Sequence, residues 1–173
     1  LKFLTKKNTE FNLTSNLNGV ELSYLPIGWV KEMDDEAELK ISGSIGDELV
    51  IDDIVLNSRN LTLVGSASQK KDEDFVIKFA KLALRDAFDL QLSIEKDGAI
   101  DITKGELNMQ EFLKLPLVKN SSGKSVPISI YLDELKLHEK QVVTRFAAAL
   151  GSSGKGEFSG VLNDLASFDG TLE

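Results

Sequence analysis

The sequence predicts an all-β fold, mainly antiparallel, in which a strongly curved open sheet or groove carries at most one or two short helices. Apolar residues recur at every second position through much of the chain, which is the period of an extended strand. Polar turn sequences interrupt these runs at intervals of about 8 to 12 residues, as in all-β proteins. Very few segments have the 3.6-residue apolar period of a helix.

The alternating runs predict strands at 37–44, 61–64, 75–79, 88–95 and 126–133. Because successive side chains of a strand point to opposite faces, each run has one apolar face and one polar face. Antiparallel sheets that are covered on one side have this pattern. Residues 145–150 have moderate helix propensity, but they continue the alternation that begins at Val142, which favours a strand.

Two segments depart from the alternation. Residues 24–33 hold the only tryptophan, Trp29, together with Pro26 and Gly28, and we expect a packed crossover rather than a regular strand. Residues 108–113 are expected to form one or two helical turns. Asn108 is suited to the N-cap and Glu111 follows three residues later, as in a capping box.

Turn signals lie between the predicted strands. Residues 70–73 form a charged hairpin tip, and Asp97-Gly98 favours a tight hairpin because glycine adopts positive φ at little cost. The Asp52-Asp53 pair is interpreted as a tight turn, and residues 120–125 and 151–156 as polar loops.

A faint repeat occurs along the chain. An apolar pair, a polar turn and an alternating strand follow one another at 54–63, 82–90 and 135–144. The spacing between copies is unequal, which excludes a strict solenoid. The pattern indicates either one hairpin unit used several times or the ordinary consequence of a meandering sheet.

Composition excludes several classes of function. The 173 residues suit a single domain, predicted here over 1–173 as a fragment of a longer chain, because no methionine or signal segment opens it. The net charge of -8 disfavours nucleic acid as a partner. The absence of cysteine and the single histidine exclude thiolate, disulfide and multi-histidine metal chemistry within one chain. No apolar run approaches the roughly 18 to 20 residues of a membrane span.

The sequence contains partial matches to ligand-binding motifs, but their residue spacing differs from that of the motifs. Residues 123–125 resemble the end of a phosphate-binding loop, but Val118 stands where that loop needs glycine, and a predicted strand follows in place of a helix. The acidic cluster 34–36 lacks the ligand spacing of a calcium loop and is interpreted as solvated. His138 is predicted to be an exposed turn residue. The chain is therefore expected not to be an enzyme and to bind no metal or cofactor.

The remaining feature is the shortage of helices to cover the apolar strand faces. Such a sheet must close on itself, pack on a second sheet or curl around something apolar. The most regular runs predict a groove that holds acyl chains. Its candidate lining residues are Phe88, Leu90, Leu92, Ile94, Val126, Ile128, Ile130 and Leu132. A core filled by the same side chains is the alternative.

Several segments together resemble the AsmA-like superfamily, in its YhdP branch. Residues 19–31, with Leu25-Pro26-Ile27-Gly28-Trp29, are similar to a strand of that branch that ends in a leucine, glycine, tryptophan and basic crossover. Residues 51–67 and 130–137 are similar to its recurrent hairpins, 107–113 to the short segment after a strand, and 156–172 to its terminal strands. The resemblance covers roughly residues 11–173, and the order of these segments carries it.

The resemblance implies a periplasmic segment of a protein anchored in the inner membrane. Members build an elongated curled β-sheet proposed to carry phospholipid acyl chains between membranes, in outer-membrane biogenesis and envelope integrity. The implied partners are phospholipid acyl chains and adjacent segments of the same polypeptide, with no nucleic acid, no cofactor and no catalytic residue. The alternative function is a structural or assembly β-domain with a filled core and no ligand.

Overall fold

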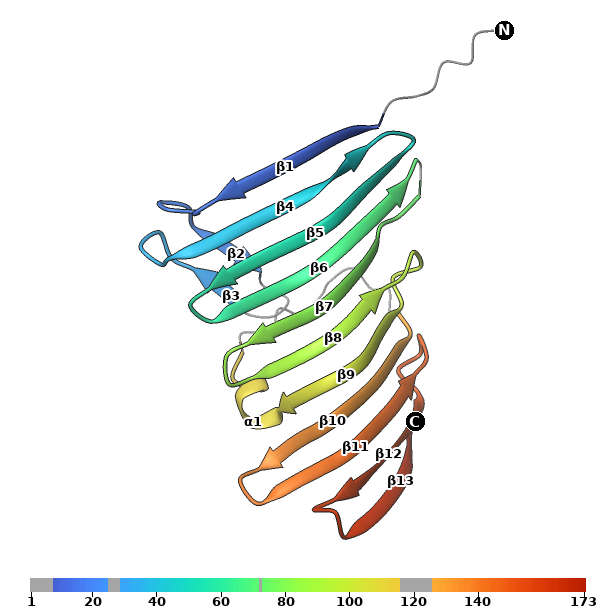
Figure 1. Ribbon diagram of the computed structural model, residues 1–173. Coiled ribbons are helices and arrows are strands. Elements are labelled where there is room, and N and C mark those ends of the chain that lie inside the picture. Colours follow the sequence, from blue (N-terminus) through green and yellow to red (C-terminus); the bar gives the residue numbers. More distant parts are fainter. Residues whose placement is uncertain (1–7, 25–28, 72, 116–125) are drawn as a thin grey trace, which may run out of the picture.

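A computed structural model describes residues 8–24, 29–71, 73–115 and 126–173. Within these residues the chain forms an all-β fold with one short helix, as the sequence predicts (Figure 1). Eleven strands make one sheet in the order β1-β4-β5-β6-β7-β8-β9-β10-β11-β12-β13, and β2 and β3 make a separate two-stranded sheet. The sheet is open, with β1 and β13 at its two edges.

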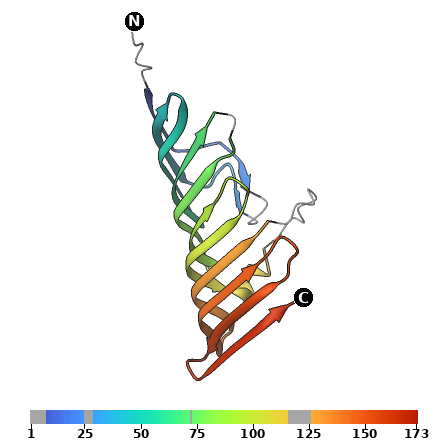
Figure 2. The ribbon, with the colours of Figure 1, turned by 90° about the vertical axis from the view of Figure 1, so that its right-hand side faces the viewer.

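The strands of the main sheet are long, and Figure 2 shows that the sheet they form is strongly twisted. Neighbouring strands are antiparallel except β9 and β10, which are parallel. The bounds are β1 Thr9–Ser15, β4 Ala37–Ile45, β5 Glu48–Ser58, β6 Leu61–Lys70, β7 Val76–Leu84, β8 Phe88–Ile94, β9 Ile100–Asn108, β10 Ile128–His138, β11 Gln141–Leu150, β12 Gly156–Leu162 and β13 Ala166–Leu172.

Bulges interrupt alternate strands of the sheet. The pairing register shifts where β5 holds one extra residue at Asp52, β7 one at Ala80, and β9 one at Thr103. A similar shift occurs in β11 beside Arg145, which has a φ of 52°. Because a bulge bends its strand and increases the local twist, this row of bulges explains how a sheet of eleven strands coils.

The Asp52-Asp53 pair shows why the sequence prediction of a turn at this point is wrong. Both residues lie inside β5, and both are exposed. A bulge places two consecutive residues of one strand opposite a single partner residue, here Ser66 between the pairs Ile51–Ala67 and Ile54–Gly65. Two adjacent polar residues therefore interrupt the alternation in a continuous strand just as a turn would.

Glycines give the bulged strands room. A Cβ added at Gly65 would lie 2.6 Å from the Lys78 carbonyl oxygen, and one at Gly43 would lie 2.1 Å from the Val50 carbonyl oxygen. Such distances are well inside van der Waals contact, so only glycine permits this approach of the neighbouring backbone.

Phenylalanine rings from the neighbouring strand lie over four of the glycines. An added Cβ at Gly43 and at Gly65 would meet Phe11 Cζ and Phe79 Cδ1, each at 3.0 Å. The same relation holds for Gly170 under Phe158 and Gly160 under Phe168. The rings cover the backbone that glycine leaves bare and keep that face of the sheet apolar.

The segment that contains Trp29 differs from its prediction. It forms the strands β2 Leu22–Tyr24 and β3 Trp29–Lys31, which pair as an antiparallel hairpin. The expectation of a crossover without regular strand is wrong, although Trp29 is packed, with 4% of its surface exposed. Figures 1 and 2 place this β2–β3 hairpin on one side of the main sheet.

The predicted short helix is confirmed as α1 Met109–Phe112. Asn108 is its N-cap, and the Asn108 side chain accepts a hydrogen bond from the Glu111 backbone N–H at 3.5 Å. The helix directly follows β9 and its residues Met109 and Phe112 pack against the core.

The three copies of the repeat are hairpins in the structure. They are β5–β6, β7–β8 and β10–β11, and their turns all lie at one end of the sheet (Figure 1). The strand predicted from Val126 begins at Ile128, and residues 145–150 lie in β11, as predicted. The 120–125 loop and the phosphate-loop resemblance at 123–125 lie outside the described residues.

The glycine at position 65 can be tested by substitution. We expect Gly65→Ala to lower the free energy of unfolding by about 1–3 kcal/mol, because its methyl group meets the Lys78 backbone. Gly151→Ala is the matched control, since its nearest neighbour would be 3.6 Å away. It should change stability by less than about 1 kcal/mol. Urea denaturation measures both, and equal stabilities would contradict the packing described.

The edge strands also lead to a prediction. Neither β1 nor β13 contains lysine, proline or a bulge, which usually prevent edge pairing, and each has only one charged residue, Glu10 in β1 and Asp169 in β13. We expect the chain to self-associate at high concentration, and the double variant Asn12→Lys/Thr171→Lys to reduce that association. Sedimentation equilibrium measures the change, and a wild-type chain that is monomeric at every concentration would contradict it.

Candidate functional site

The apolar face of the main sheet is continuous from edge to edge. Paired residues of neighbouring strands lie on the same face, so the register connects them into rows. The outer row is Phe11, Gly43, Ile51, Ala67, Ile77, Ile94, Ile100, Ile128, Leu150, Gly156 and Leu172. The middle row is Leu13, Ile41, Ile54, Gly65, Phe79, Leu92, Ile102, Ile130, Ala148, Phe158 and Gly170.

These two rows cross all eleven strands without one polar side chain. With neighbouring strands about 4.8 Å apart, each row is about 48 Å long. The opposite face is mixed, with Val55 and Val64 paired on it, but it carries charged and polar side chains next to the middle row. Lys40, Gln91 and Glu157 are all exposed there.

A third row, the inner row, begins at β6 and lies toward the end of the sheet where the repeated hairpins turn. It consists of Leu61, Leu84, Phe88, Leu107, Leu135, Val143, Leu162 and Ala166. Most of its large side chains are buried, and Trp29 of the β2–β3 hairpin belongs to the same cluster. Met109, Phe112 and Leu115 pack against it from α1 and the residue that follows. This end of the apolar face is therefore a filled core.

The outer and middle rows are less covered. Their large side chains are only partly buried along most of the sheet, and at the two edges Leu13 and Leu172 are 50% and 48% exposed. A protein of this size ordinarily keeps large contiguous apolar areas out of water, so a face of this extent is unusual.

The predicted lining residues divide between these two environments. Phe88, Leu90 and Leu132 are buried in the core cluster. The half-buried ones are Leu92, Ile94, Ile128 and Ile130, of the outer and middle rows, and Val126, which lies two residues before β10. The structure brings β8 and β10 onto one face through β9, with Leu92 paired to Ile102 and Ile102 paired to Ile130.

The apolar face also includes strands that the sequence analysis did not assign to it. Residues of β4 to β7 and of β11 to β13 belong to the same apolar rows as those of β8 and β10. A spacing of three between apolar residues marks each bulge, as between Ile51 and Ile54 or Phe79 and Leu82. That spacing is visible in the sequence. It would have predicted that the apolar residues before and after each bulge belong to one continuous strand.

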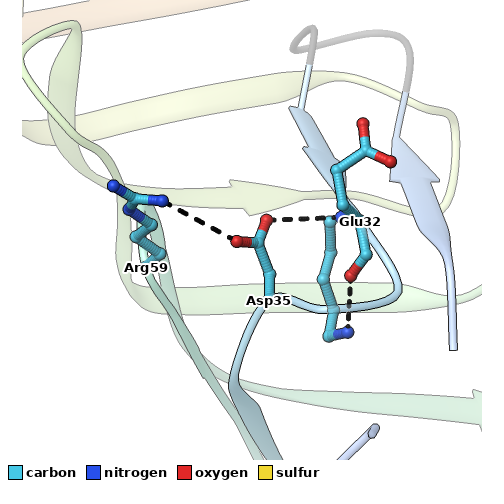
Figure 3. A network of polar contacts seen from close by, with 4 residues as sticks. Glu32, Asp35 and Arg59 are labelled. Atoms are coloured by element: carbon cyan, nitrogen blue, oxygen red, sulfur yellow. Dashed lines mark hydrogen bonds and ion pairs between the residues drawn. The ribbon is translucent and has the colours of Figure 1, made fainter. Parts of the chain in front are cut away.

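Polar contacts connect the residues that follow the β2–β3 hairpin to the main sheet (Figure 3). The Asp35 carboxylate accepts a hydrogen bond from the Glu32 backbone N–H at 3.3 Å and lies 3.9 Å from the Arg59 guanidinium in the β5–β6 turn. This partly exposed pair contributes about 0–1 kcal/mol, so apolar packing of Trp29 is the stronger attachment.

Two buried polar groups lie in this hairpin. Lys31 is 1% exposed, and its ammonium donates to the backbone carbonyl oxygens of Val20 at 2.9 Å and Glu32 at 3.0 Å. The Trp29 indole N–H is buried and has no hydrogen-bond partner among the described residues. Sequence reasoning placed Trp29 in a packed segment but gave no role to Lys31.

Charged side chains at the other end of the sheet form surface pairs. Lys96 of the β8–β9 turn donates to Glu73 of the β6–β7 turn. This hydrogen bond holds the pKa of the Glu73 carboxyl below its usual value. His138 is exposed, as expected from the sequence, but it is the last residue of β10 and not a turn residue. In the acidic cluster 34–36, Asp34 and Glu36 are exposed, whereas Asp35 is partly buried.

The described residues offer little else that resembles a site. They contain no group of three or more His, Cys, Asp or Glu residues placed to hold a metal ion. The surface hollows on this part of the chain have mixed polar linings, for example beside the β7–β8 turn with Arg85, Asp86, Asn108 and Lys136. No described helix is both long and apolar enough to cross a membrane.

Comparison with known proteins gives no further assignment. No family model, no curated protein and no solved structure matches the chain.

The two environments of the apolar face predict different costs of truncation. Leu132→Ala removes a side chain that is 2% exposed and should lower the free energy of unfolding by about 2–5 kcal/mol. Leu13→Ala, at the half-exposed edge of the middle row, should cost less than about 1 kcal/mol. Thermal and urea unfolding of the two variants measure the difference, and equal costs would show that the face is packed uniformly.

Proposed function

We propose that the chain is a non-catalytic lipid-handling module, in which the outer and middle rows hold phospholipid acyl chains. The observation that carries this proposal is the pair of unbroken apolar rows across all eleven strands, left partly exposed beside a filled inner row. An apolar surface of this kind is favourable only if something apolar covers it.

Burial of acyl methylenes supplies the gross energy of lipid binding. Each methylene transferred from water to an apolar surface contributes about 0.8 kcal/mol. Ten buried methylenes therefore give a gross gain of about 8 kcal/mol, from which the loss of ligand freedom is subtracted. The remaining affinity depends on how completely the rows surround the chain.

The resemblance to the AsmA-like superfamily supports a wider role. On that basis we propose a periplasmic segment of an inner-membrane-anchored protein, which contributes to outer-membrane biogenesis or envelope integrity. The edges β1 and β13 would then adjoin neighbouring segments of the same polypeptide, and the lack of lysine, proline or bulges on them fits strands that are normally paired.

A substitution on one strand distinguishes this function from a structural domain with a filled core. Ile130→Asp places a carboxylate in the middle row, where the parent side chain is only partly buried. We expect at least a fivefold loss of co-purifying phospholipid, with the fold retained, because water can still reach the carboxylate. Tyr131→Asp is the control, since Tyr131 is the next residue of β10, points to the opposite face and is 42% exposed.

Quantitative lipid mass spectrometry and thermal unfolding are measured on the same preparations. Unfolding of the Ile130→Asp variant, together with no lipid in the parent protein, would support the structural alternative and contradict the proposal. Equal lipid loss in both variants would show that the acyl chains do not select the apolar face.

A further inference from the structure

The β2–β3 hairpin presents two buried hydrogen-bond donors toward the apolar face. We propose that Trp29 and Lys31 bind the anionic head of a lipid, an oxyanion at the end of an acyl chain. The inference rests on the proposed function, because it places the polar end of the same ligand whose apolar part the outer and middle rows would hold.

The Trp29 indole supplies the first donor. Its side chain is 4% exposed and packs in the core cluster with Leu61, Leu84 and Phe88, yet its N–H has no acceptor among the described residues. Buried polar groups are almost always paired, and an unpaired one carries a desolvation cost that a ligand oxygen would remove.

Lys31 supplies the second donor and the charge. Its ammonium carries three N–H groups and donates to two neutral carbonyl oxygens, which leaves one donor available. Among the ion pairs of the described residues none includes Lys31, although the side chain is 1% exposed. A buried charge is favourable only with a partner of opposite sign, so the hairpin itself favours an anion.

The two donors are oriented alike. In β3 the residues Trp29 and Lys31 are buried while Val30 between them is exposed, so both side chains leave the same face of the strand. Trp29 defines that face as the one toward the main sheet, since it packs on the inner row. The two side chains therefore start from one face of β3, with their Cα atoms about 6.6 Å apart.

Entry of a ligand would not require a break in the main sheet. The hairpin is a separate two-stranded sheet, and the Asp35–Arg59 pair connects the segment after it to the β5–β6 turn. A head group that reaches Lys31 would displace side-chain contacts of the hairpin and leave the eleven-stranded ladder intact.

The single tryptophan of the chain makes the site directly measurable. The probes are 2-bromostearate and its methyl ester, whose bromine atom lies next to the head group and quenches tryptophan fluorescence on contact. For the wild-type chain we expect the acid to quench Trp29 at about one tenth of the ester concentration, a difference of about 1.4 kcal/mol. In Lys31→Met, which keeps the apolar stem, the acid should lose that advantage while the ester is unchanged.

Lys40→Met is the matched control, because Lys40 is exposed on the polar face of β4 and should leave both probes unaffected. Equal quenching by acid and ester in the wild-type chain would overturn the head-group site while acyl binding by the apolar face still stands. Failure of both probes to quench, with no lipid in the parent protein, would overturn the proposed function as well.

If Lys31→Met does not fold, the comparison of acid with ester in the wild-type chain decides the question alone. Competition between 2-bromostearate and unlabelled stearoyl lysophosphatidic acid separates the two sources of the oxyanion. Tighter binding of this phosphate than of the carboxylate assigns the site to a phospholipid head, and the reverse order assigns it to a free fatty acid.

Discussion

The structure depends on one constraint: the register must keep apolar side chains on a single face across eleven strands. A shift of one residue in any strand would move its whole apolar set to the other face. Each bulge shifts the strand beyond it by one residue, and the apolar spacing in β5 and β7 changes from two to three at the bulge. Backbone geometry and side-chain pattern therefore change together, and the face stays continuous.

The same constraint divides the face into a filled part and an open part. The inner row is buried under Trp29 and α1, which gives the sheet a core although no second layer covers it fully. The outer and middle rows extend beyond that cover to both edges. From β6 onward, the buried residues that stabilise the sheet are thereby separated along each strand from the surface that we propose for lipid, so a lipid could enter or leave while the inner row keeps the sheet folded.

Much of the fold could be predicted from the sequence because its determinants are local. Period-two alternation gave the all-β class, and the Asn108 and Glu111 spacing gave the helix and its cap. The prediction that 24–33 contains no regular strand is wrong because its strands have only three residues each, too few for an alternating pattern. Asp52-Asp53 was misjudged because a bulge and a turn both produce adjacent polar residues.

The candidate site was predictable only in part. Alternation identified which residues of β8 and β10 share a face, but Phe88 and Leu132 proved to be buried under elements distant in sequence. Whether the β2–β3 hairpin covers a residue depends on tertiary structure, and the sequence of β8 or β10 alone does not predict it. For the same reason the buried environment of Lys31 could not be inferred from the sequence. A lysine beside a glutamate is ordinarily expected on the surface.

The central claim, that acyl chains lie along the apolar face, is tested most directly by photo-crosslinking. A photo-reactive amino acid is placed one position at a time in the middle row, at Ile41, Leu92, Ile130 and Phe158, and at their polar-face neighbours Lys40, Gln91, Tyr131 and Glu157. After expression in cells and irradiation, mass spectrometry identifies the adducts. The account predicts phospholipid adducts at all four middle-row positions and none at their neighbours. Adducts of equal yield on both faces, or none on the middle row, would contradict it.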